Sequence, residues 1–139
     1  MDAATFERGD LPEHYLHENL YNYYFKKRYQ RYDPLPGLIP AVKAVRHRVS
    51  IAVGTTKKCP YCVATVPMMI RIFLEAENPA LSMRIFDNTK HLMPQDFSGL
   101  RMPQFMVYDE RFNRLFVLND STIKEIFETA FLEELNKIL

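Results

Sequence analysis

The sequence has 139 residues, the length of one domain, and its 47% hydrophobic and 25% charged residues are typical of a folded globular protein. Eighteen basic residues against seventeen acidic ones give a net charge of +1, so the charge balance does not indicate nucleic-acid binding. No apolar run approaches the roughly 20 residues of a membrane helix, and two cysteines are too few for a disulfide-stapled secreted scaffold.

The N-terminal residues Met1 to Asp10 contain acidic side chains and no basic stretch followed by an apolar core. This composition is not that of a secretory signal or an organelle transit peptide, so we expect a cytoplasmic protein. In that reducing compartment a close pair of cysteines is more often catalytic or metal-binding than structural.

The chain divides at residues 33–37 (Asp-Pro-Leu-Pro-Gly), where two prolines and a glycine stop a helix. We therefore expect an N-terminal helical arm over residues 1–36 and a second unit over residues 37–139. Within the arm, Asp10, Pro12 and Glu13 indicate the start of a helix that runs from about Leu11 to Tyr29.

Six of the eight tyrosines lie between Tyr15 and Tyr32. Two interpretations of this tyrosine-rich segment stay open. It could cover the rest of the molecule with its ring faces buried, or it could bind a partner, including a second copy of this chain.

The second unit alternates between strand-like and helical patterns. A short helix is expected over 38–48, a strand over 49–53, a long helix from Cys59, a strand over 81–86, and a short helix or loop over 93–99. Two strands, 104–108 and 114–118, form a predicted hairpin, and an amphipathic helix from Ser121 ends the chain. The first two strands should be parallel and the last two antiparallel, which predicts an α/β fold with a mixed four-stranded sheet flanked by helices.

The sequence Cys59-Pro60-Tyr61-Cys62 carries the candidate chemistry. Its position just after a strand places Cys59 at the N-terminus of the long helix, where free backbone N–H groups favour an anion. The preceding Lys57 and Lys58 add positive charge, and together these effects should depress the pKa of the Cys59 thiol. Cys62, three residues on and on the same helix face, is then the resolving thiol.

A zinc site is the competing interpretation of the cysteine pair. It would need two further ligands, and His14 and His17 are the only closely spaced histidines. A second Cys-x-x-Cys motif is absent, and the two histidines belong to the arm, so this interpretation is the weaker one.

From Val49 to the C-terminus the sequence resembles the thioredoxin and glutaredoxin superfamily. The Cys-Pro-Tyr-Cys motif is typical of glutaredoxins and of archaeal-type protein disulfide oxidoreductases, and the chain is similar to one unit of the latter. Pro67 stands five residues after Cys62, where thioredoxins carry a helix-kinking proline. Met102-Pro103, directly before a strand, matches the cis-proline of the superfamily.

The sequence also departs from that superfamily. Lys58 replaces the tryptophan that precedes the first cysteine in thioredoxins, and Val53 replaces their buried aspartate, so no proton acceptor for Cys62 can be named. Thr56 stands where glutaredoxins have a glutathione-binding lysine. Leu118-Asn119-Asp120-Ser121 replaces their glycine pair and aspartate, and Asp120 and Ser121 are better explained as the cap of the last helix.

The resemblance implies a thioredoxin-like fold and dithiol–disulfide exchange on protein substrates. Cys59 would attack, Cys62 would resolve, and Tyr61, Met102 and Pro103 would contact the substrate. The reaction needs no bound cofactor or metal; electrons would come from a reductase or a small thiol. Two other functions stay open: a thioredoxin-like binding module that uses the tyrosine-rich arm, and a glutathione-dependent glutaredoxin.

Overall fold

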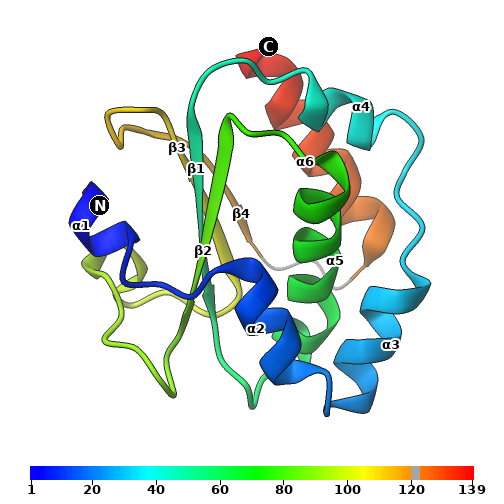
Figure 1. Ribbon diagram of the computed structural model, residues 1–139, viewed down its shortest axis with the longest axis vertical. Helices are drawn as coiled ribbons and strands as arrows, with labels where there is room; N and C mark the ends of the chain where they lie inside the picture. Colours follow the sequence, from blue (N-terminus) through cyan, green and yellow to red (C-terminus); the bar gives the residue numbers. More distant parts are fainter. Residues whose placement is uncertain (120–122) are drawn as a thin grey trace.

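The computed structural model describes residues 1–119 and 123–139, in which helices cover both faces of a central sheet (Figure 1). The elements follow one another as α1 (Ala3–Phe6), α2 (Pro12–Asn19), α3 (Tyr23–Arg31), α4 (Leu38–Lys43), β1 (Val49–Thr55), α5 (Pro60–Ala76), β2 (Leu81–Asp87), the 3-10 turn η1 (Gln95–Phe97), β3 (Gln104–Tyr108), β4 (Arg114–Asn119) and α6 (Lys124–Ile138).

The sheet has the strand order β2-β1-β3-β4. As predicted, β1 and β2 are parallel, and β3 and β4 are antiparallel; β1 also pairs with β3 in the antiparallel sense. β1 lies in the middle and is buried on both faces, which suits its β-branched and apolar sequence. The carboxyl end of this central strand leads directly into the loop that carries Cys59.

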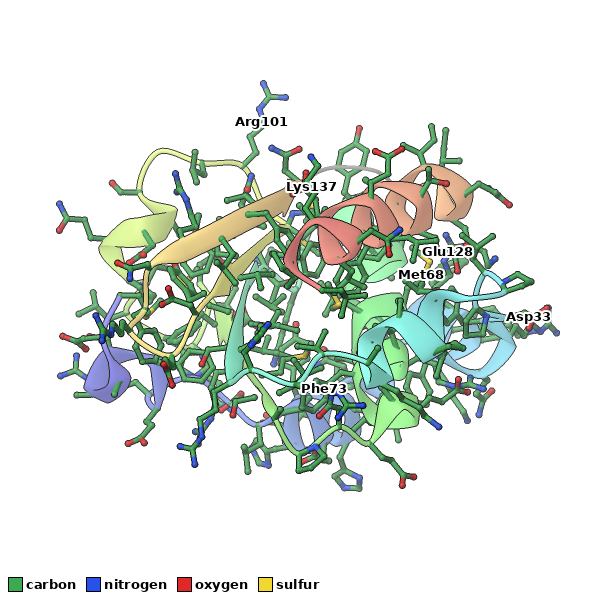
Figure 2. The ribbon with its side chains drawn as sticks, turned by 90° about the horizontal axis from the view of Figure 1, so that it is seen from above. Asp33, Met68, Phe73, Arg101, Glu128 and Lys137 are labelled. Carbon is green, nitrogen blue, oxygen red and sulfur yellow. The ribbon has the colours of Figure 1, made fainter. Side chains whose placement is uncertain are left out.

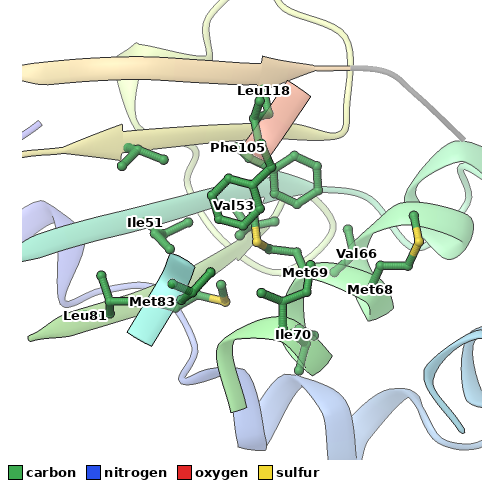
Figure 3. Close-up of a cluster of buried hydrophobic side chains, with 14 of the residues drawn as sticks. Ile51, Val53, Val66, Met68, Met69, Ile70, Leu81, Met83, Phe105 and Leu118 are labelled. Atoms are coloured by element: carbon green, nitrogen blue, oxygen red, sulfur yellow. The ribbon is translucent and has the colours of Figure 1, made fainter. Parts of the chain in front are cut away.

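The larger core lies between the sheet and α5. Ile51 and Val53 of β1, with side chains of the other three strands, face Met69 and Ile70 of α5 (Figure 3). Helices α2 to α6 all lie on this side of the sheet, whereas α1 and η1 lie on the other (Figure 1). Burial of so many large apolar side chains supplies most of the stabilisation of such a fold.

The arm departs from its predicted structure. Instead of one helix from Leu11 to Tyr29, two helices are present, with residues 20–22 between them. Asn22 starts α3, because its side chain accepts hydrogen bonds from the backbone N–H groups of Tyr24 and Phe25, both at 3.1 Å. A further helix, α1, was not expected; the Asp2 carboxylate caps it by accepting from Thr5 N–H at 2.8 Å.

The second part of the chain follows its predicted elements with small differences at the ends. The helix expected to reach Arg48 ends at Lys43, where the side-chain amide of Asn78 donates to the carbonyls of Val42 at 2.9 Å and Val45 at 2.8 Å. The last helix is described from Lys124; its predicted cap, Asp120 and Ser121, lies outside the described residues.

The arm packs against the rest of the molecule. Its buried aromatic side chains, Tyr15, Phe25 and Tyr32, belong to the same core cluster as β1 and α5. At the end of the arm, the buried carboxylate of Glu128 on α6 accepts from the Tyr32 hydroxyl at 2.5 Å and from Leu35 N–H at 2.6 Å. Glu128 and Asp33 accordingly lie on the same side of the molecule (Figure 2). The boundary between residues 36 and 37 stays a prediction.

The N-terminal segment also pairs with the sheet. Asp10 and Ile85 exchange two backbone hydrogen bonds of 2.8 Å, which places residue 10 along the outer edge of β2. Gly9 permits this approach, because a Cβ at its position would lie 2.9 Å from Arg84 Cβ and from the Phe86 ring. None of the helices in the described ranges is long and apolar enough to cross a lipid bilayer.

Candidate active site

Cys59 is the last residue before α5. Its backbone is extended, with a φ of −105°, and Pro60 occupies the first helical position, where no backbone donor is missed. The Cys59 carbonyl accepts from Val63 N–H at 3.1 Å, so the helix is hydrogen-bonded from its first turn. The Cys59 side chain is partly exposed, and neither cysteine is in a disulfide. The sulfur therefore lies at the positive end of a 17-residue helix and within reach of solvent.

The loop before β3 lies directly beside this sulfur. The Met102–Pro103 peptide bond is cis, as the resemblance implied. The Cys59 thiol donates to the Met102 carbonyl, with 3.7 Å between Sγ and the oxygen. Gly54 of β1 leaves room for this loop, since a Cβ there would lie 2.9 Å from the Met102 sulfur and 2.7 Å from the Phe97 ring.

The other predicted site residues lie on the rim. Tyr61 is 58% exposed, Lys58 is exposed, and Lys57 is half-buried in the loop between β1 and Cys59. Pro103 is buried next to the half-buried Met102. The structure thus brings Cys59 and Met102 into contact, with Lys57 and Lys58 on the chain segment that leads to the cysteine. The roles of these residues stay predictions.

Cys62 lies one helical turn behind Cys59 and is only 3% exposed. This burial raises the pKa of the Cys62 thiol to about 12, and the neighbouring Cys59 thiol acts in the same direction. The Thr55 side chain and the Thr56 backbone N–H oppose the shift without cancelling it. Cys62 is therefore a protonated thiol at neutral pH, and it must lose its proton before it can act as a nucleophile.

A small polar cavity adjoins Cys62. Its volume is about 10 Å³, close to the smallest space that holds one water molecule. Tyr15 and Asn19 of α2 line it together with Thr55 of β1. The Thr55 hydroxyl is buried beside Cys62 and Tyr15, and it lowers the pKa of both groups. The surroundings of Cys62 thus include side chains of the arm, which the sequence pattern alone did not connect to the cysteines.

A buried carboxylate also lies in this region. Val53 occupies the position where the superfamily has its aspartate, and it is fully buried. Asp87, at the end of β2, is the residue that pairs with Thr55 in the sheet. It is fully buried, and its Oδ2 atom has no hydrogen-bond partner in the described part of the chain. Burial raises the pKa of Tyr15, and the charges of Asp87 and Cys62 add to that effect, so all three groups share one neighbourhood.

Asp87 was not recognised from the sequence because an aspartate at a strand end is usually part of a turn. That local signal is present: its Oδ1 atom accepts from the Thr89 backbone N–H at 2.9 Å and from the Thr89 hydroxyl at 2.7 Å. The burial of the Asp87 Oδ2 atom depends on the tertiary fold, and no pattern in the neighbouring sequence indicates it.

The histidines of the competing zinc interpretation are not brought to the cysteines. His14 and His17 are exposed on α2. Within residues 1–119 and 123–139, the group of side chains that could hold a metal ion is Asp10, His14 and Glu18, and it contains no cysteine. The Lys90 ammonium lies 2.8 Å from both Asp10 and Glu18. An ammonium is thus already paired with both carboxylates of this group.

Comparison with known families agrees with this arrangement. A family model described as thioredoxin matches residues 10–130. The chain belongs to the thioredoxin family. The predicted α/β, thioredoxin-like fold with a mixed four-stranded sheet is therefore confirmed. The matched range begins at residue 10, so it includes α2 and α3 of the arm.

Two solved structures share the thioredoxin-like fold over almost the whole chain. One is an HIV epitope-scaffold, 14% identical, with a TM-score of 0.67, covering 99% of this chain and 95% of its own. The other is a protein of unknown function from Pseudomonas aeruginosa, also 14% identical, with a TM-score of 0.62 and the same coverage. At this identity the likeness is one of fold. No curated protein matches the sequence.

Proposed function

We propose that this thioredoxin-family protein is a thiol–disulfide oxidoreductase that exchanges disulfides with protein substrates. The observation that carries the proposal is the position of Cys59. Its partly exposed sulfur lies at the N-terminus of α5 and 3.7 Å from the Met102 carbonyl, next to a cis-proline, with Cys62 one turn behind. A thiol at a helix N-terminus, accessible to solvent and followed by a second thiol, is the usual arrangement of a dithiol redox site.

The reaction proceeds in two exchanges. The Cys59 thiolate attacks one sulfur of a substrate disulfide, forms a mixed disulfide with it, and releases the other substrate sulfur as a thiolate. Cys62 then loses its proton and attacks the Cys59 sulfur. This step forms the Cys59–Cys62 disulfide and releases the second substrate thiolate, so two electrons pass from the protein to the substrate. The released thiolates take up protons from solvent.

The high pKa of Cys62 makes its deprotonation the demanding part of the second exchange. The cavity beside it has room for one water and adjoins the Thr55 hydroxyl. Asp87, whose second oxygen is unpartnered among the described residues, lies at the position that pairs with Thr55. We propose that Asp87, the sheet neighbour of Thr55, is the group that finally accepts the Cys62 proton.

Electrons for the next cycle come from a reductase or a small thiol, and the cytoplasm is the compartment where such donors are abundant. The substrate is held on two sides. Tyr61 projects from the helix start into solvent, and the Met102 loop flanks the sulfur. No cofactor takes part in the exchange.

Reduction of insulin by the protein, with dithiothreitol as electron donor, tests the proposal. We expect activity that disappears in Cys59→Ser, because the attacking sulfur is removed. In the absence of dithiothreitol, Cys62→Ser should stop the reaction at the mixed disulfide, so that substrate stays covalently attached to Cys59 until dithiothreitol is added. Activity retained in Cys59→Ser would refute the proposal.

A binding module is the second candidate, because the arm presents tyrosines to solvent. Tyr21 and Tyr24 are each 75% exposed and Tyr23 is 60% exposed. Aromatic side chains in this number on one surface are typical of protein interfaces, including a dimer of this chain. In this case the biological function would persist in Cys59→Ser and be lost when these three tyrosines are replaced by serine.

A further inference from the structure

A groove of about 760 Å³ opens beside the Cys59 sulfur. It lies between α3 of the arm and the start of α5, which run next to each other in the fold (Figure 1), and Lys124 at the start of α6 also lines it. Its volume is within the range of natural binding sites. Because Cys59 itself belongs to the lining, a molecule in this groove would be held next to the reactive sulfur.

The groove is strongly basic. Six of its described lining residues are cationic and none is acidic: Lys27, Arg28, Arg31, Lys57, Lys58 and Lys124. The whole chain carries a net charge of only +1, so this concentration is a local property of the groove. Cations crowded in one concave surface repel one another and attract an anionic ligand.

Most of these cations have no carboxylate partner among residues 1–119 and 123–139. Lys124 pairs with Glu128 at 2.8 Å. In contrast, none of the ion pairs among the described residues involves Lys27, Arg31, Lys57 or Lys58. Two of these side chains come from α3 and two from the loop before Cys59, so the uncompensated charge lies on both sides of the groove.

The groove also has apolar surface between the cations. Tyr24 and Tyr32 contribute rings from the arm, and Pro60, Val63 and Ala64 contribute aliphatic surface from α5. A simple inorganic anion would leave this surface uncovered. A polypeptide segment that carries several carboxylates and some apolar side chains would match both the cations on the two walls of the groove and the apolar surface between these cations.

We propose that this groove binds an acidic segment of the protein substrate, next to the cysteine that exchanges with Cys59. The inference rests on the proposed oxidoreductase function and adds the substrate class: disulfide proteins whose reactive cysteine is flanked by aspartate or glutamate. Lys27 and Arg31 meet the carboxylates on one side, and Lys57 and Lys58 meet them on the other. The arm therefore supplies one wall of the substrate site.

Binding is measured without catalysis, so that failure of this inference and failure of the proposed function can be told apart. The protein is Cys59→Ser/Cys62→Ser, and the probes are two fluorescent peptides of equal length and equal apolar content, with serine in place of cysteine. One carries glutamates and the other glutamines. We expect the glutamate peptide to bind roughly 10-fold more tightly at low salt, and the difference to shrink at about 0.5 M NaCl as the charges are screened.

The variant Lys27→Glu/Arg31→Glu should abolish the preference for the glutamate peptide. Lys27→Gln/Arg31→Gln removes the same two charges without reversing them. It should reduce the logarithm of the affinity ratio between the glutamate and glutamine peptides by about half. The matched control is Lys26→Glu/Lys43→Glu. It changes the net charge by the same amount at exposed positions of α3 and α4 outside the groove, and should keep the preference. Thermal unfolding of each variant checks that the fold is intact.

The same comparison is then made with active protein and the disulfide-bonded forms of the two peptides. We expect kcat/KM to favour the glutamate disulfide roughly 10-fold, and glutathione disulfide to gain no comparable advantage over a neutral disulfide of similar size. Equal binding of the two peptides, or a preference unchanged by Lys27→Glu/Arg31→Glu, overturns the inference even if insulin is reduced. So does a preference for glutathione disulfide over both peptides, because the groove would then be a small-molecule site.

Discussion

The substitution Glu128→Ala should destabilise the protein strongly, because this carboxylate joins the arm to α6. It is fully buried, and its Oε2 atom accepts from both the Tyr32 hydroxyl and Leu35 N–H, while its Oε1 atom accepts from Lys124. Alanine leaves the first two donors without an acceptor. An unsatisfied buried donor costs about 1–3 kcal/mol, so the expected loss is about 2–6 kcal/mol. This is a large part of the 5–15 kcal/mol that stabilises a typical domain.

Urea unfolding followed by circular dichroism measures this loss, and Glu133→Ala is the matched control. Glu133 is an exposed glutamate on the same helix, so its replacement should change the free energy of unfolding by less than about 0.5 kcal/mol. Glu128→Gln should lose only about 1 kcal/mol. Its amide oxygen can serve Tyr32 and Leu35, and Lys124 can turn toward solvent. If Glu128→Ala is as stable as Glu133→Ala, the carboxylate does not hold the arm.

Three further predictions follow from the site. Gly54→Ala should lower the free energy of unfolding by about 1–3 kcal/mol and reduce insulin-reducing activity, because the alanine Cβ would meet the Phe97 ring and the Met102 sulfur. Unchanged urea unfolding and activity in this variant would contradict the packing. Iodoacetamide at neutral pH should label Cys59 alone, and mass spectrometry should find no label in Cys59→Ser; labelling of Cys62 would show that it is not buried. Finally, the folded state holds the Cys62 proton up to a pKa of about 12, whereas the unfolded chain releases it near pH 8.5. Stability should therefore fall by about 1–2 kcal/mol as pH rises from about 8.5 to 10, and by less in Cys62→Ala.

The sheet and the position of the cysteines could be predicted from the sequence because both are encoded locally. β1 is a continuous run of small and β-branched residues, and β3 consists of Gln104 followed by four apolar or aromatic residues. Pro60 favours the first position of a helix, so Cys59 had to lie at the helix start. The parallel and antiparallel pairings follow from the length of the connections between strands.

The arm was predicted less well because its helical periodicity concealed a break. Residues 11–29 keep apolar side chains at helical spacing, but Asn22 caps a new helix with its side chain. An asparagine followed by the aromatic residues of α3 was the available signal. The deeper features had no signal. The hydrogen bond from Tyr32 to Glu128 joins residues 96 positions apart, and only the fold brings the arm cations to the Cys59 groove.

Pairing of Asp10 with Ile85 has a consequence for solubility. β2 is an outer strand of the sheet, and outer strands offer free backbone groups to which other chains can add. The backbone of residue 10 pairs with some of the outer backbone groups of β2, and Gly9 lies close against Arg84 and Phe86. We therefore expect a chain shortened to begin after residue 10 to expose the backbone groups of β2 around Ile85 and to self-associate more readily through this strand.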